Sequence, residues 1–251
     1  MRTPSNSALP QIRGRNRFVP AQRPVGNRLL EILATESCRH QYPRLEHVRL
    51  EAGMVIIESE ARPSHVYFPE DCAVSLLCST YDGATAEVGM IGNEGALGLA
   101  PFLGGESMPG EAMVQTSGRA ARVPAQLVKD MFQQCSVFQA QVLRFTQAFI
   151  TQLVQRSICN RVHSIEQRLC RWLLFAQDLT RRDELNVTQE VIGTMLGARR
   201  EGVNHAADRL TDAGLIRYTR GRVTNLERAG LEARGCEGHG VIRKEYDRLL
   251  A

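Results

Sequence analysis

The hydrophobic period of the chain changes near Gln126, and this change divides the 251 residues into a β part and a mainly helical part. Before Gln126, short runs rich in Val, Ile and Tyr recur about every ten residues. Such spacing is typical of an antiparallel sandwich or barrel. Asp82-Gly83 supplies the clearest hairpin turn, because this pair readily adopts positive φ. The predicted strands are HVRL, MVIIES, HVYFPE, AVSLLCSTY, TAEVGMI, EAMVQTS and AARVPA.

A long segment without proline follows, SVFQAQVLRFTQAFITQLVQRSI, and its apolar residues predict one helix. One stripe of this helix consists of Phe138, Val142, Phe145, Phe149 and Leu153. The stripe either packs back on its own domain or forms a seam with a second chain. We favour the seam, because the segment is longer than a small β domain could cover. These five residues are therefore the predicted homodimer interface.

The remaining sequence predicts a helix-turn-helix. A helix over 164–179 carries Trp172, the only tryptophan, as a core anchor. Thr188 is a candidate N-cap for the next helix, and Gly197 can end it because glycine tolerates the left-handed conformation. A further helix starts at once, and two short helices joined by a tight glycine-containing turn are the motif. Its predicted inward face is Val203, Ala206, Ala207 and Leu210. Two short strands, 215–219 and 222–226, then predict a wing.

The first turn of the second helix carries Arg199, Arg200 and Glu201, although acids alone would suit a solvated helix start. In a helix-turn-helix this turn enters the DNA major groove. Arginine can bond a guanine bidentately, and glutamate can accept from cytosine N4. We therefore predict that Arg200 and Glu201 read bases and that Arg199 contacts phosphate. Asn204, His205, Thr188, Arg220 and Arg222 complete the predicted DNA-binding set. The alternative is a solvated Arg-Glu pair, which contributes little.

Charge is distributed unevenly along the chain. Residues 1–28 contain six arginines and no acidic residue, residues 29–159 have nine basic and fourteen acidic residues, and residues 160–251 have sixteen basic and thirteen acidic ones. A polyanionic partner would therefore meet the ends of the chain. The proline-rich, aperiodic N-terminal segment predicts a disordered tail. It is either a DNA-contacting arm or only a soluble leader.

The order of β domain, long helix, helix-turn-helix and wing resembles the Crp/Fnr family of bacterial transcription regulators, over roughly residues 28–226. The most specific stretch is TQEVIGTMLGARREGVNHAADRLTDAGLI. The resemblance implies an α+β chain with a jelly-roll-like, cyclic-nucleotide-binding-like domain, a dimerisation helix and a winged helix-turn-helix. We expect a basic tail over 1–27, the β-roll domain over 28–130, the dimerisation helix over 131–160 and the DNA-binding domain over 161–251. His205 stands where the family often has a further base-reading arginine.

The stretch GNEGALGLAPFLGGESMPGEAMV departs from the pattern of cyclic-nucleotide-binding relatives. Those relatives pair a glutamate with an arginine that compensates the cyclic phosphate. Here the region of that arginine holds Met108, Pro109, Gly110 and Glu111. Because no arginine is present to pair with the phosphate, we expect no cyclic AMP binding. The glycines either shape turns or line a pocket for another effector. The candidate pocket residues are Glu94, Gly95, Ala96, Leu97 and Gly98.

Other classes of protein lack support in the sequence. No P-loop, G-x-S-x-G or H-E-x-x-H motif indicates an enzyme, so we expect no catalytic residues. The first 37 residues contain no cysteine for an iron-sulfur centre, and the histidines have no diagnostic haem spacing. Cys236 and His239 have the spacing of half a zinc site, which we interpret as a loop. We therefore expect no cofactor and no metal.

The expected partners are double-stranded DNA and a second copy of the chain, with RNA polymerase and a small-molecule effector as further candidates. The competing interpretations are a protein-interaction module that uses the β domain and the winged helix without DNA, and a cyclic-nucleotide-dependent regulator of the same family. Seven scattered cysteines indicate reduced thiols. With no secretory signal and no apolar run of membrane-spanning length, we expect a cytoplasmic protein and no membrane contact. A further helix is expected over 241–250, with no assigned role.

Overall fold

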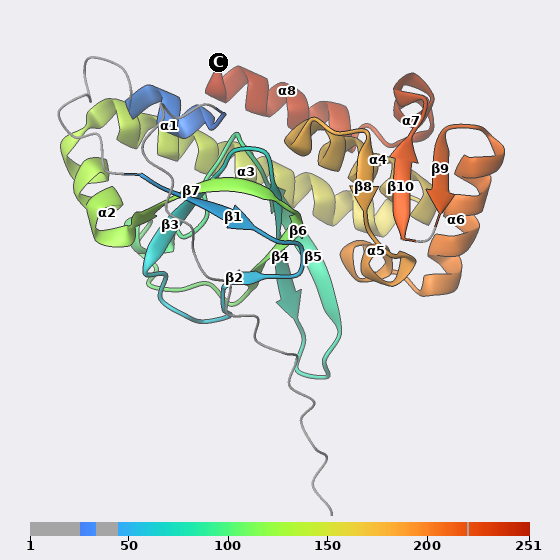
Figure 1. Cartoon of the computed structure of the whole chain (residues 1–251), viewed down its shortest axis with the longest axis horizontal. Coiled ribbons are helices and arrows are strands. Elements are labelled where there is room, and N and C mark those ends of the chain that lie inside the picture. The colour runs from blue at the N-terminus through green and yellow to red at the C-terminus, as the bar shows by residue number, and fades with distance from the viewer. Residues whose placement is uncertain (1–25, 34–44, 220) are drawn as a thin grey trace, which may run out of the picture.

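The computed structural model describes residues 26–33, 45–219 and 221–251. Figure 1 shows a β domain beneath long helices, with a smaller mixed lobe beside it. Nearly all of the predicted basic tail lies outside the described residues, and so does Arg220. All seven predicted strands of the β part are present.

The β part consists of two antiparallel sheets. One has the order β1-β7-β3 and the other the order β2-β6-β4-β5. This is the predicted β-roll. Gly83, in the turn between β4 and β5, has a φ of 89°, as the Asp-Gly pair predicted. The strands are β1 (Glu46–Leu50), β2 (Val55–Ile57), β3 (His65–Pro69), β4 (Ala73–Ser79), β5 (Thr85–Ile91), β6 (Glu111–Thr116) and β7 (Gly118–Pro124).

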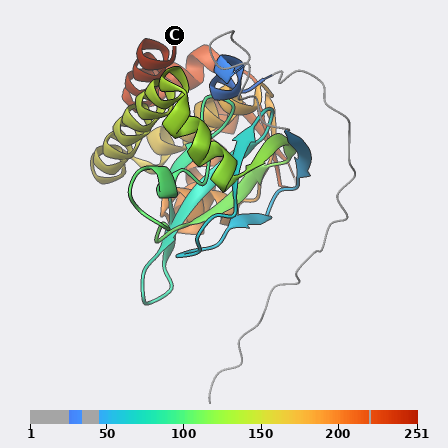
Figure 2. The same cartoon turned by 90° about the vertical axis from the view of Figure 1, so that its left-hand side faces the viewer.

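Helices close one side of the β-roll (Figure 2). Asn27 caps the first of them by accepting from the backbone N–H groups of Leu29 and Leu30 at 3.1 and 3.3 Å. Its amide also donates to the Gly95 carbonyl oxygen at 2.8 Å, which ties this helix to the candidate pocket loop. The helices of this part are α1 (Arg28–Leu33), the short 3-10 helix η2 (Ala100–Phe102), α2 (Ala125–Gln134) and the long α3 (Ser136–Val162).

The C-terminal lobe begins with α4 (Ile165–Thr180). Ser164 and Gln167 form a reciprocal capping box at its start. Trp172 is 1 % exposed, so the predicted core anchor is confirmed. The lobe continues with β8 (Glu184–Asn186), α5 (Gln189–Leu196), α6 (Arg200–Asp212), β9 (Ile216–Thr219) and β10 (Arg222–Asn225). Its sheet has the order β8-β10-β9. The sequence predicted the β9–β10 wing but not β8, which is only three residues long.

The chain ends in two helices, α7 (Arg228–Arg234) and α8 (Gly238–Leu250). α7 packs on α4, whereas α8 returns along α3 (Figure 1). Ile242, Tyr246 and Leu250 of α8 belong to the core of the β-roll domain. The Tyr246 hydroxyl accepts from the Gln152 amide at 3.3 Å. α8 therefore ties the C-terminal lobe back to the long helix.

The two lobes share a second core. Ala73, Leu77 and Met90, on β4 and β5, are buried together with apolar side chains of α4, α5 and α6. β4 is buried on both faces for this reason, since one face meets the β-roll interior and the other meets the C-terminal lobe. The β4–β5 ribbon is thus one contact between the two lobes, beside that of α8 with the β-roll core.

Five cysteines among the described residues are free thiols, namely Cys72, Cys78, Cys159, Cys170 and Cys236. Cys135 is disulfide-bonded, so the expectation that all seven are reduced is wrong at this position. Within the described residues, every helix is too short or too polar to cross a lipid bilayer.

Candidate nucleic-acid interface and sensor cavity

The turn between α5 and α6 is built as the sequence predicted. The Thr188 hydroxyl accepts from the Val191 N–H at 3.2 Å and caps α5. Gly197 ends α5 with a φ of 56°, in the left-handed region. The Ala198 N–H donates to the Gly193 carbonyl at 2.9 Å, and α6 begins two residues later.

Packing against α4 fixes which face of α6 is outward. The predicted inward residues Val203, Ala206, Ala207 and Leu210 are all buried. A Cβ at Gly202 would lie 2.5 Å from Ile165 Cδ1, so glycine permits the close approach of α4 and α6. The opposite face of α6 is left to solvent.

Arg199, Arg200, Glu201 and His205 are exposed on this outward side, and Asn204 is half-buried. Neither Arg199 nor Arg200 has an ion-pair partner among the residues that the structure describes. Both stand at a helix N-terminus, whose partial positive charge adds to theirs. An anion bound here would be stabilised both by the arginine charges and by the helix N-terminus.

The wing lies beside the start of α5. A Cβ at Gly221 would lie 3.6 Å from the Thr188 side chain, which places the wing tip next to the α5 cap. The exposed Arg222 pairs with Glu184 of β8, with 3.3 Å between Nε and Oε1. Arg217 on β9 is also exposed, although it is absent from the predicted DNA-binding set. Strand alternation could have found it, because Ile216 is buried beside it.

The candidate effector residues are divided between two cavities. Ala96, Leu97 and Gly98 line an apolar cavity of about 280 Å³ inside the β-roll. Its other walls come from strands, η2 and α3, and none of the described side chains in its lining is charged. Thr146 of α3 is the single polar side chain among those described lining residues, and the aromatic wall is Phe145 and Phe149.

Glu94 instead lines a polar recess of about 190 Å³ between the β-roll, α4 and α8. Its Oε1 accepts from the Gly92 N–H at 3.1 Å, while Oε2 is buried without a partner among the described residues. Burial raises the pKa of Glu94 to about 7. Gly95 lines neither cavity. A Cβ there would lie 2.1 Å from the Phe145 ring, so this glycine serves close packing against α3.

The predicted dimer seam is wrong for three of its five residues. Phe138, Val142 and Phe145 are at most 2 % exposed, because they pack into the β-roll core of their own chain. Phe149 and Leu153 are half-buried. A different stripe of α3 faces outward, made of Leu143, Ile150, Val154 and Ile158 at 49, 47, 64 and 54 % exposure. The helical period could have found this second stripe too, since its members are seven, four and four residues apart.

Cys236 and His239, whose spacing we interpreted as a loop and not as a zinc site, face different partners. His239 is buried and its Nε2 lies 2.8 Å from the Asp178 carboxylate. Cys236 lies in the loop between α7 and α8, as expected, but faces Cys159 of α3.

Comparisons with known proteins agree with this architecture. Residues 47–135 match the family model described as the cyclic nucleotide-binding domain. Residues 167–234 match the model of the Crp-like helix-turn-helix domain. Together the two matches cover more than half of the chain. No curated protein sequence matches it significantly.

Solved structures are similar in fold. FixK2 from Bradyrhizobium japonicum has a TM-score of 0.65 at 15 % identity, over 76 % of this chain and 98 % of that one. A CRP-family transcriptional regulator from Thermus thermophilus has a TM-score of 0.62 at 19 % identity, over 74 % and 95 %. The c-di-GMP-responsive regulator CLP from Xanthomonas campestris has a TM-score of 0.59 at 12 % identity, over 72 % and 93 %. With its two domains in this order, the chain belongs to the Crp/Fnr family of DNA-binding transcription regulators and is not an enzyme.

Proposed function

We propose that the protein binds a palindromic DNA site as a homodimer and responds to an uncharged, largely apolar ligand in the β-roll cavity. The observation that carries the DNA part is the exposed start of α6, where Arg199 and Arg200 have no ion-pair partner within the described residues. Arg200 and Glu201 read a guanine and a cytosine in the major groove. Arg199 and Arg222 contact DNA phosphates. The Thr188 hydroxyl donates a hydrogen bond to a phosphate oxygen.

The dimer part rests on the outward stripe of α3. Leu143, Ile150, Val154 and Ile158 expose four large apolar side chains on one helix face, opposite the face that packs on the β-roll. Such a row is buried when two α3 helices pair. Pairing sets two copies of α6 about one DNA turn apart, as a palindrome requires.

The ligand part rests on the chemistry of the cavity wall. A cyclic phosphate would need a cationic partner, and the described lining offers no charged side chain. An apolar molecule would instead gain from every contact with the wall. We therefore expect no binding of cyclic AMP.

Selection of bound duplexes from a random DNA pool, near physiological salt, tests the DNA part. Enrichment of a two-fold palindrome is expected, and affinity should fall steeply as salt rises because phosphate contacts release counterions. Absence of any enriched sequence, with or without a ligand, contradicts the proposal and favours a protein-interaction role.

Calorimetric titration tests the ligand part, with 1-decanol as an apolar probe and cyclic AMP as the charged comparison. We expect saturable binding of decanol only. Ala112→Leu adds volume to the cavity wall and should abolish it, whereas Ala84→Leu, on the exposed β4–β5 turn, should not. Saturable binding of cyclic AMP, or decanol binding that Ala112→Leu leaves unchanged, contradicts the assignment.

A further inference from the structure

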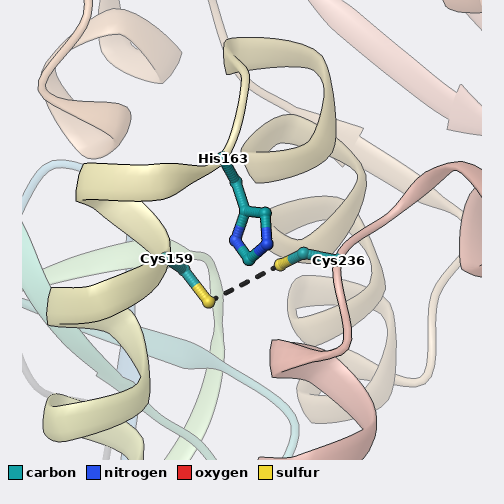
Figure 3. A group of neighbouring side chains, drawn as sticks. All are labelled: Cys159, His163 and Cys236. Carbon is teal, nitrogen blue, oxygen red and sulfur yellow. Dashed lines mark hydrogen bonds between the residues drawn. The ribbon is translucent and has the colours of Figure 1, made fainter.

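Two cysteines and a histidine from distant parts of the chain meet where the lobes join. Cys159 and His163 lie at the C-terminal end of α3, and Cys236 lies in the loop between α7 and α8. Figure 3 shows the three side chains pointing toward one another. Their ligand atoms all lie within 4.8 Å of one another, and the two Sγ atoms are 3.7 Å apart.

The spacing of the sulfur atoms fits a metal better than a disulfide. Two thiolates bound to one tetrahedral Zn²⁺ at about 2.3 Å lie about 3.8 Å apart. A disulfide would need about 2.05 Å. The observed 3.7 Å, at which the Cys236 thiol donates to the Cys159 sulfur, is close to the length of a zinc tetrahedron's edge.

The histidine has a nitrogen available for a metal. Its Nδ1 is buried and has no hydrogen-bond partner among the described residues. Its Nε2 lies 3.3 Å from the Glu237 carboxylate. A metal-bound imidazole commonly donates its second N–H to a carboxylate, which orients the ring and increases its basicity.

A buried cation lies beside the two thiols. Arg171 is 1 % exposed, and its Nε and Nη1 lack hydrogen-bond partners among the described residues. Its Nη2 donates to the Asn160 side chain at 3.2 Å, and no described carboxylate pairs with it. Both Cys159 and Cys236 are close enough to Arg171 to act on it electrostatically. The two sulfur atoms therefore share a buried polar site with this guanidinium.

The loop can reach α3 because of a glycine. A Cβ at Gly238 would lie 2.7 Å from the sulfur of Cys159 and 3.3 Å from that of Cys236. A side chain at this position would require the Cys159 sulfur to move from its observed place. Gly238 therefore supports a function that needs the sulfurs close together.

We propose that Cys159, His163 and Cys236 bind one Zn²⁺ per chain, with Glu237 orienting the histidine. Two thiolates and an imidazole are donors that zinc prefers, and a water molecule takes the fourth position. The site stands independently of the DNA and ligand proposals.

The proposed zinc site lies between segments that belong to different lobes. α3 belongs to the β-roll core, whereas the α7–α8 loop leads out of the winged-helix lobe. A metal bridging the two segments fixes the lobes relative to one another. Zinc occupancy should therefore raise the unfolding temperature of the full chain.

Cobalt titration of the purified, reduced, metal-free full chain tests the proposal, because Co²⁺ bound by thiolates gives charge-transfer and intense d–d absorption. We expect one Co²⁺ per chain, displaced by Zn²⁺ with loss of the spectrum. Cys159→Ser and Cys236→Ser should each weaken binding by at least about 100-fold. Cys72→Ser, which removes another buried free thiol in the β-roll, should leave it unchanged.

Because the cysteine variants could lose their fold, Glu237→Gln provides a second test at a 65 % exposed side chain. It should weaken cobalt binding about 10- to 100-fold while retaining the spectrum. The proposal is overturned by a wild-type titration without thiolate charge transfer, by binding that survives Cys159→Ser, or by mass mapping of a Cys159–Cys236 disulfide in freshly purified protein.

Discussion

Glu87 on β5 and Arg156 on α3 form an ion pair inside the molecule, with 2.5 Å between Oε1 and Nη1. Both side chains are at most 4 % exposed. The other carboxylate oxygen of Glu87 accepts from the Ser75 hydroxyl at 2.5 Å and from the Trp172 indole N–H at 3.4 Å. One carboxylate thus connects β4, α3 and α4. It lies where the β-roll, the long helix and the DNA-binding lobe meet.

Removal of either Glu87 or Arg156 alone should lower the stability of the fold. Glu87→Ala leaves the Arg156 charge buried and uncompensated, and we expect a loss of about 3 to 5 kcal/mol in the free energy of unfolding. The double variant Glu87→Ala/Arg156→Ala should lose less than the sum of the single losses. Urea unfolding followed by tryptophan fluorescence measures all three. As a surface control, Glu106→Ala breaks an exposed pair with Arg62 and should cost at most about 1 kcal/mol. Additive losses in the cycle would mean that the two charges do not interact.

The sequence predicted the elements of this fold well, because each carries its own local signal. Asp82-Gly83 marked a hairpin, and Thr188 and Gly197 marked the two ends of α5. It was harder to predict which part of the protein buries each apolar helix face. Periodicity placed Phe138, Val142 and Phe145 on one stripe, but a stripe does not reveal whether its own domain or a second chain buries it.

Polar contacts between distant segments carried no sequence signal. Glu87 is one acid among many in the strand region, and nothing near it points to Arg156. The same holds for Cys236, whose sequence neighbour His239 pairs with Asp178 while Cys159 and His163 approach from α3. The prediction that residues 94–98 line a single pocket was wrong for a related reason. The chain turns at Asn93 and Glu94, so Glu94 faces the polar recess while Ala96, Leu97 and Gly98 face the apolar cavity.

Stability should depend on pH through Glu94. Burial raises its pKa from 4.5 to about 7, against weaker opposing contributions from backbone N–H groups and Arg28, while Asp178 adds to the rise. The folded protein therefore keeps a proton that the unfolded chain releases. Stability from this group is complete below about pH 4.5 and is lost as pH rises through 7. The shift corresponds to a few kcal/mol at most.

Glu94→Gln removes this dependence, since the amide does not titrate. The free energy of unfolding of the variant minus that of the wild type should rise between pH 5 and pH 8, by about 2 to 3 kcal/mol. Denaturant titrations across this range give the difference. Glu58→Gln, at an exposed position, is the matched control. A difference that stays flat with pH, or falls, would contradict the burial of an uncompensated carboxyl at Glu94.

Dimerisation should depend on the outward stripe of α3. Val154→Asp puts a charge in the centre of the proposed seam on both chains, so the dimer dissociation constant should rise by at least about 100-fold. Sedimentation velocity measures it, and circular dichroism should be unchanged because Val154 is 64 % exposed in the single chain. Val55→Asp, at an exposed valine on β2, should leave the dimer intact. A Val154→Asp protein that remains dimeric would place the interface elsewhere.

Alanine variants of Arg200 and Arg222 should affect DNA binding differently, because Arg200 is proposed to read a base and Arg222 to contact a phosphate. Arg200→Ala removes a bidentate guanine contact, so binding to the selected site should weaken by about 1 to 3 kcal/mol while binding to a site with that guanine replaced changes little. Arg222→Ala should weaken both sites equally and lower the salt slope by about one, because it removes a phosphate contact. Fluorescence anisotropy over a salt series resolves the two behaviours. Arg209→Ala is the control, since Arg209 is held by Glu166. If Arg200→Ala weakens both sites equally, Arg200 contacts the backbone, and sequence preference must come from Glu201, Asn204 or His205.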